Sequence, residues 1–293
     1  MGILSGKNNF MDEKDIVLKI VEVTALEAYK DSAKPALMVV GKALGQCVSL
    51  FTTPIGRTAK IFEKNINKYL DKLEGFSEAE LISPDTRILV PILDKMRYTE
   101  DELVSNYYAE ILSAASKKET KGKVLLTFIE ILNRVTADEI KILEFINSPK
   151  NFITIDATIL TEEERTKFNL PNSHVDILCT DGIPIIDVKI ENTNKIGYEL
   201  VLNNFNLLPD CVLLEFPESI NSYLDNLISL GLLHIPNNKK FALNLIYKNL
   251  KEHKNVKEIE SKLINGDTIS FAESRIDLTS LSLSLLSICK KII

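Results

Sequence analysis

Apolar side chains recur every three to four residues through the first half of the chain, which is the spacing of helices with one buried face. Prolines and glycines interrupt this pattern and separate its segments. Residues 99–102 read TEDE, a capping-box pattern, and Thr136 is a second capping residue. Ser83, Pro84 and Pro91 bracket a short connector with room for one helical turn. The pattern predicts helices over residues 12–33, 36–51, 56–73, 99–116, 124–135 and 136–147.

The pattern changes near residues 147–149, beyond which short segments rich in β-branched residues alternate with turn residues. These segments predict strands over residues 152–159, 174–179, 183–190, 232–235 and 270–277, and helical spacing returns over residues 217–230, 239–262 and 278–289. We therefore expect a mainly α protein with two domains. A helical N-terminal domain covers residues 1–135, and an α+β, winged-helix-like C-terminal domain covers residues 136–293.

The winged-helix interpretation gives a role to four of the C-terminal segments. Residues 136–147 are its first helix, residues 217–230 its recognition helix, and the last two predicted strands its wing. A helix that enters the major groove of DNA normally carries cations, whereas residues 217–230 contain no Lys or Arg and include Glu218 and Asp225. This favours a protein-interaction domain. A DNA-binding regulator is the alternative, with nucleic-acid contacts from Lys239, Lys240, Lys248 and Lys251.

A metal-dependent nuclease is a second alternative. The run HVDILCTDGIPIIDVKI places Asp176, Asp187 and Lys189 on two predicted strands that flank an Asp181-Gly182 turn. In PD-(D/E)xK nucleases two carboxylates bind Mg²⁺ and a lysine positions the attacking water. Such residues also recur by chance, and residues 196–208 supply poorly the further helix and strand that a nuclease core needs. A solvated hairpin is therefore the simpler interpretation.

Across residues 36–56 the only charged side chain is that of Lys42. Gly41 and Gly45 are four residues apart, a spacing that lets two helices approach closely. Lys42 makes a membrane span costly, by up to about 3 kcal/mol at the centre of the span, and Pro54 interrupts the segment. Core packing is therefore expected ahead of conditional membrane attachment, and a self-association face is the other functional interpretation of the segment. The association or membrane face would consist of Gly41, Leu44, Gly45, Val48 and Phe51.

The amino-acid composition shows few candidates for catalytic or metal-binding residues. The 293 residues carry a formal net charge of -6, which argues against a protein that coats nucleic acid through its whole surface. The four cysteines form no CxxC pair and the three histidines lie far apart, so neither a disulfide framework nor a zinc site is expected. The first residues lack the pattern of a signal peptide. We predict a cytoplasmic protein with no metal and no cofactor, with a peripheral membrane location as the alternative.

The N-terminal half contains several sequence blocks whose order and spacing resemble those of a known protein family. They are ALEAYKDSAKPALMVVGKAL from Ala25, MRYTEDEL from Met96, YYAEILSAA from Tyr107, FIEIL from Phe128 and VTADEIKIL from Val135. These blocks resemble the abortive infection alpha family of bacterial phage-defence proteins. The C-terminal half resembles the family more loosely, through YLDNLISLGLL and IDLTSLSLSLLSIC. The blocks are apolar and capping patterns, so they specify a fold and carry no catalytic group.

The resemblance implies defence against phage by halting or killing the infected cell. One departure concerns Leu125 and Leu126, which stand where family members often carry a His-Pro pair, so no role of that histidine applies here. We predict a non-enzymatic defence protein that acts through association with a protein partner or with itself. A phage component is its expected trigger, membrane engagement is a further option, and nucleic acid is the less favoured partner.

Overall fold

The computed structural model describes residues 57–148, 152–178, 182–192, 196–264 and 266–289. These residues form two compact units, one of residues 57–136 with 287–289 and one of residues 137–286. The first unit is helical, whereas the second, which we call the mixed unit, combines helices and strands. The chain is therefore a mixed α+β protein rich in helix. The helices predicted over residues 12–33 and 36–51 lie outside the described residues.

The helix α5 (Glu102–Ala115) is the centre of the helical unit, and most of its side chains are buried. It contacts α3 (Arg57–Asp71), α4 (Thr86–Met96) and α6 (Leu126–Leu132), and the short helix η2 (Lys121–Lys123) precedes α6. The hydroxyl of the fully buried Tyr69 lies 2.6 Å from that of Ser116, just beyond the end of α5. Apolar faces at helical spacing therefore hold this unit together, as its sequence pattern predicted.

The helical unit differs from the prediction at two places. The helix α4 occupies the region expected to be a connector and contains Pro91 in its interior. Proline removes a helical hydrogen bond, but α4 buries five apolar side chains and Asp85 caps its start. Burial therefore outweighs the local cost of the proline. The second difference is the cap of α5, which is Asp101 and not Thr99.

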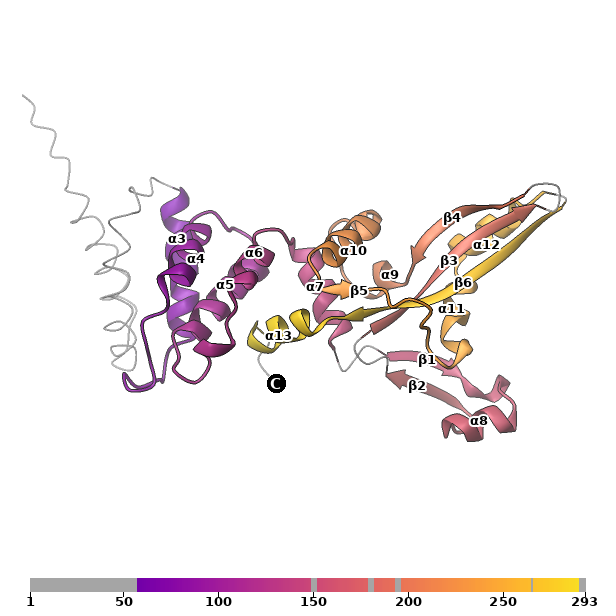
Figure 1. The fold of residues 1–293 in the computed structure, drawn as a ribbon, viewed down its shortest axis with the longest axis horizontal. Helices are drawn as coiled ribbons and strands as arrows, with labels where there is room; N and C mark the ends of the chain where they lie inside the picture. Colours follow the sequence, from indigo (N-terminus) through magenta and orange to yellow (C-terminus); the bar gives the residue numbers. More distant parts are fainter. Residues whose placement is uncertain (1–56, 149–151, 179–181, 193–195, 265, 290–293) are drawn as a thin grey trace, which may run out of the picture. The chain divides into compact units, whose positions relative to one another are not determined.

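A four-stranded antiparallel sheet organises the mixed unit. Its strands are β3 (Gly182–Asn192), β4 (Tyr198–Phe205), β5 (Leu233–His234) and β6 (Asp267–Leu278). In space their order is β4-β3-β6-β5 (Figure 1). β3 and β6 pair along eleven residues, from Gly182 opposite Asp277 to Asn192 opposite Asp267. β4 is thus an edge strand, bonded on one side to β3.

One face of this sheet is covered by short helices. Ile186 and Val188 of β3 pack there with Tyr247, Leu250 and Val256 in one buried cluster. The last three residues belong to η5 (Asn244–Tyr247), α11 (Lys248–Lys251) and α12 (Lys254–Ser261), of which α11 and α12 lie along the sheet in Figure 1. The single helix predicted over residues 239–262 is therefore wrong. In one continuous helix Tyr247 and Val256 would be about 180° apart around the axis, and a break lets both face the sheet.

The mixed unit also contains a second, smaller sheet and several further helices. An antiparallel pair, β1 (Phe152–Asp156) and β2 (His174–Leu178), forms a second, two-stranded sheet. η3 (Ala157–Ile159) and α8 (Glu162–Phe168) connect these two strands, and a capping box of Thr161 and Glu164 starts α8. The remaining helices are α7 (Ala137–Ile146), α9 (Leu208–Cys211), η4 (Pro217–Ser219), α10 (Ile220–Ser229) and α13 (Ser280–Cys289).

A buried carboxylate fastens α7 to the segment that precedes α10. Asp138 is 4% exposed and accepts the backbone N–H groups of Glu215 (2.8 Å) and Phe216 (3.1 Å). The Tyr223 hydroxyl (3.2 Å) and the Lys141 ammonium (2.9 Å) also donate to it. Burial alone would raise the pKa of Asp138, but the hydrogen bonds from Lys141, Glu215 and Phe216 lower it below its usual value. The ionised carboxylate therefore stabilises this junction at neutral pH.

We expect Gly182→Ala to destabilise the mixed unit. A Cβ at Gly182 would lie 2.6 Å from the carbonyl oxygen of Ile276, so the end of the β3–β6 ladder would have to shift. The expected loss is about 1–3 kcal/mol in the free energy of unfolding, measured by urea denaturation and circular dichroism. Gly122→Ala is the matched control, because nothing lies within 4 Å of a Cβ there. An equal effect of the two substitutions would contradict the prediction.

Candidate functional site

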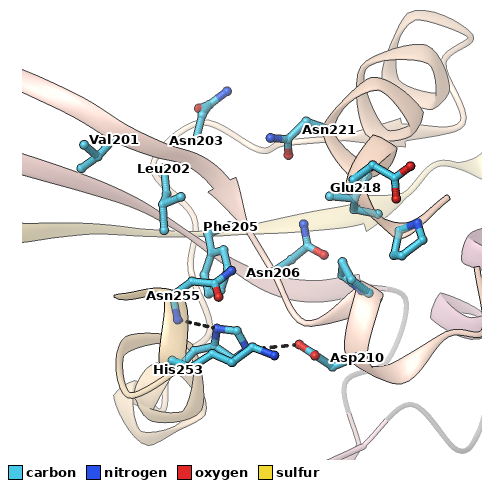
Figure 2. Close-up of a pocket in the computed structure, with 14 residues that line it drawn as sticks. Val201, Leu202, Asn203, Phe205, Asn206, Asp210, Glu218, Asn221, His253 and Asn255 are labelled. Carbon is cyan, nitrogen blue, oxygen red and sulfur yellow. Dashed lines mark hydrogen bonds and ion pairs between the residues drawn. The ribbon is translucent and has the colours of Figure 1, made fainter. Parts of the chain in front are cut away.

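The mixed unit contains an open groove of about 460 Å³ at the end of β4. Figure 2 shows this groove between the C-terminal part of β4, the start of α10 and the start of α12. Leu202 and Phe205 contribute apolar surface to its lining. Four amide side chains also line it, and they come from different segments of the chain: Asn203, Asn206, Asn221 and Asn255. We call this feature the asparagine groove.

An irregularity of β4 shapes the groove. The register of β4 against β3 shifts between the pairs Ile186–Phe205 and Val188–Leu202, which leaves an extra residue on β4, a β-bulge. Asn204 lies in this bulge with a φ of 50°, a conformation that asparagine adopts more readily than most residues. The carboxylate of Asp187 accepts the Asn204 N–H at 2.9 Å. Asp187 therefore satisfies a main-chain donor within the bulge.

Asn206 turns the chain from β4 towards α9. Its side chain is buried, and its amide nitrogen donates to the carbonyl oxygen of Asn204 at 2.9 Å. Its amide oxygen accepts the Leu208 N–H at 3.0 Å. Because both polar atoms of this side chain already have partners within the chain, Asn206 holds the shape of the groove and is not its main ligand-binding group.

His253 forms another part of the lining, and its ring is fixed on three sides. Nδ1 accepts the Asn255 N–H at 3.3 Å, and Nε2 lies 3.3 Å from a carboxylate oxygen of Asp210 (Figure 2). The ring centroid is 5.2 Å from that of Phe205. A general base needs an accessible ring nitrogen, and here both nitrogens have partners. His253 therefore positions α12 and covers Phe205, and it is poorly placed for proton transfer.

The remaining three amides are available to a ligand. Asn203, Asn221 and Asn255 are exposed, and among the described residues their side chains have no hydrogen-bond partner. The charged residues of the lining are two carboxylates, Asp210 and Glu218, and one ammonium, Lys254. The groove therefore offers uncharged donors and acceptors with an acidic balance around them, which suits a neutral or basic ligand and disfavours a polyanion.

The structure separates the residues proposed for a nuclease. Asp176 lies on β2, which pairs with β1, whereas Asp187 and Lys189 lie on β3, which pairs with β4 and β6. The hairpin predicted around Gly182 is therefore wrong, because β2 pairs with β1 and β3 pairs with β4 and β6. The Lys189 ammonium lies 4.2 Å from the centre of the Tyr198 ring. Within the described ranges, no group of three or more His, Cys, Asp or Glu residues is placed to hold a metal ion.

Three of the four lysines proposed for nucleic acid contact glutamates. Lys240 and Lys251 pair with Glu273 at 2.5 Å and 2.6 Å, and Lys248 lies 3.9 Å from Glu252. Burial alone would raise the pKa of Glu273, but its hydrogen bonds with the two ammonium groups lower it. Lys239 is exposed. These ion pairs reduce the positive charge available to phosphates on this surface.

The predicted association face, Gly41, Leu44, Gly45, Val48 and Phe51, lies outside the described residues. In the part of the chain that the structure describes, no helix has both the length and the apolar composition of a membrane span.

Sequence reasoning did not find the asparagine groove. The stretch NNFN at residues 203–206 is a local signal, since asparagines at the end of a strand favour bulges and turns. Asn221 and Asn255 come from segments that were predicted only as helices with polar faces. Their convergence depends on how β4, α10 and α12 pack, which no local pattern shows.

Comparison with known proteins places the chain in a family. A family model for abortive infection alpha matches residues 61–289, most of the chain. The chain belongs to the abortive infection alpha family. No curated protein and no solved structure gives a significant match. The asparagine groove, with its lining between residues 201 and 255, lies within the part of this abortive infection alpha protein that the family model covers.

The role of Asp187 can be tested by substitution in this abortive infection alpha protein. Asp187→Ala removes the acceptor of the Asn204 N–H, and we expect a loss of about 1–3 kcal/mol in the free energy of unfolding. Asp187→Asn keeps an acceptor oxygen and should lose less. Urea unfolding measures both. A loss of Mg²⁺-dependent DNA cleavage in both variants, at unchanged stability, would instead support the nuclease interpretation.

Proposed function

We propose that this abortive infection alpha protein defends the cell against phage by binding a protein partner through the mixed unit. Membership of the family supports an abortive-infection role, since the family model matches residues 61–289. The observation that carries the binding mechanism is the asparagine groove. Its exposed amides come from three elements and meet on one open surface, as expected of a recognition site.

The winged-helix-like interpretation is part of this proposal. Helix α10 contacts α7, and the chain turns at Gly231, which has a φ of 70°, directly into β5. β5 then pairs with β6, with Leu233 opposite Leu278. This order of helix, turn and paired strands supports a winged-helix-like arrangement. The low cationic content of α10 supports its use for protein interaction.

Self-association and a phage component as trigger belong to the same proposal. The partner can be a host protein or a phage protein, because the groove recognises the chemistry of a polypeptide segment, whichever organism the segment comes from. Membrane engagement through residues 36–51 stays a prediction from the sequence.

Phage challenge tests this function. Cells that express the full chain, infected with a panel of phages, should release fewer phages, and infected cells should die before lysis. We expect the double variant Asn203→Ala/Asn221→Ala to lose protection by roughly tenfold or more in plaque number, as for the loss of a binding hot spot. Membrane-potential and DNA-integrity measurements on the same cells would report how the cells die.

A matched control is Asn172→Ala/Asn249→Ala, which removes two exposed amides outside the groove. It should protect as well as the unmodified chain. A chain that protects against no phage in the panel would contradict the defence role. Full protection by the groove variant would contradict binding through the groove.

A further inference from the structure

We infer that the asparagine groove binds an extended peptide segment of the partner, neutral or basic in charge, which lies along the edge of β4. This inference rests on the proposed function and specifies the partner's chemistry at the same site.

β4 lies at the edge of the four-stranded sheet. Among the described strands it pairs on one side only, with β3. Successive side chains of a strand point to opposite faces, so a groove lined by Val201, Leu202 and Asn203 in succession runs along the edge of the strand. A strand edge presents main-chain N–H and C=O groups, and an added peptide strand can pair with them.

The exposed amides of the groove have the same hydrogen-bonding groups as a peptide main chain. The side chains of Asn203, Asn221 and Asn255 each carry both donors and an acceptor, as a peptide unit does. An asparagine can therefore bond a partner's main chain at its N–H and its C=O together. Since the three amides lie around one groove, they can hold an extended backbone, while selectivity for basic side chains comes from Asp210 and Glu218.

Nucleic acid fits the groove less well than a peptide does. Single-stranded nucleic acid is bound by cations along its backbone and by aromatic rings on which bases stack. Here Asp210 and Glu218 line the groove against one lysine, Lys254, and the Phe205 ring already packs against His253. A peptide with Lys or Arg beside its bound stretch matches these carboxylates better than a phosphate chain does.

The bulge limits the length of such a partner segment. A regular edge strand can be extended by any chain of similar pattern, whereas the bulge at Asn204 bends β4 and stops regular pairing. Before the bulge, the groove is lined by residues 201–203 of β4, which span about 10 Å at strand spacing, so the segment that pairs with them is short. The site therefore favours a short linear segment over the edge of a second sheet.

A peptide selection tests the inference. Random linear peptides of twelve residues would be selected by mRNA display against the purified full chain, and the enriched peptides measured by fluorescence anisotropy. We expect Asn203→Ala/Asn221→Ala to weaken their binding by roughly tenfold or more. Asn172→Ala/Asn249→Ala should leave binding unchanged. N-methylation of the peptide backbone at alternate residues should abolish it, because the methyl groups remove N–H donors to β4.

Three outcomes would overturn the inference. They are the absence of enriched peptides, binding that the groove substitutions leave unchanged, and tighter binding of a twelve-nucleotide single-stranded DNA than of any selected peptide. Equal melting temperatures of the variants and the unmodified chain would show that lost binding is not lost folding. A chain that fails this selection but still protects cells loses only the peptide inference. A chain that binds peptides but gives no protection loses the proposed function.

Discussion

The long pairing of β3 with β6 is the constraint on which the mixed unit depends. Its two strands are separated by more than seventy residues, yet they pair without interruption along eleven positions. Close approach at one end requires Gly182, because any side chain there would meet the backbone of Ile276. Forming such a ladder means closing a long loop, and burial of apolar side chains on one face compensates for that entropy. Ile186 and Val188 provide this burial against the short helices.

The asparagine groove is a consequence of this pairing. Since β6 occupies one side of β3, β4 takes the other side and becomes the edge of the sheet. The bulge at Asn204 turns the end of that edge, and Asp187 on β3 bonds the bulge from within the sheet. The residue that the sequence suggested as a metal ligand thus has a structural role in the geometry of the groove. The asparagine groove and the strands that support it therefore belong to the same sheet.

Local sequence patterns predicted the positions of helices and strands better than they predicted which of these elements pair or pack together. Helices such as α5 were predictable because a helix buries a stripe of its own residues, and β3 was predictable from its β-branched run. The full length of α4 was missed, and only a helical turn was expected there, because Pro91 is a local signal against helix, while the burial that overrides it involves other helices. The break at His253 was missed for the same reason, since it serves packing of Leu250 and Val256 on the sheet. Neither β pairing nor the convergence of Asn203, Asn221 and Asn255 has a signature at short range.

Hydrogen exchange of the full chain, followed by mass spectrometry or NMR, tests this account most directly. If the β3–β6 ladder supports the mixed unit, the amides of residues 183–190 and 269–276 should exchange slowest in that unit and at a common rate, whereas those of β1 and the outer edge of β4 should exchange earlier. Slower exchange in β1–β2 or in α10 than in β3 and β6 would contradict the central place of the ladder.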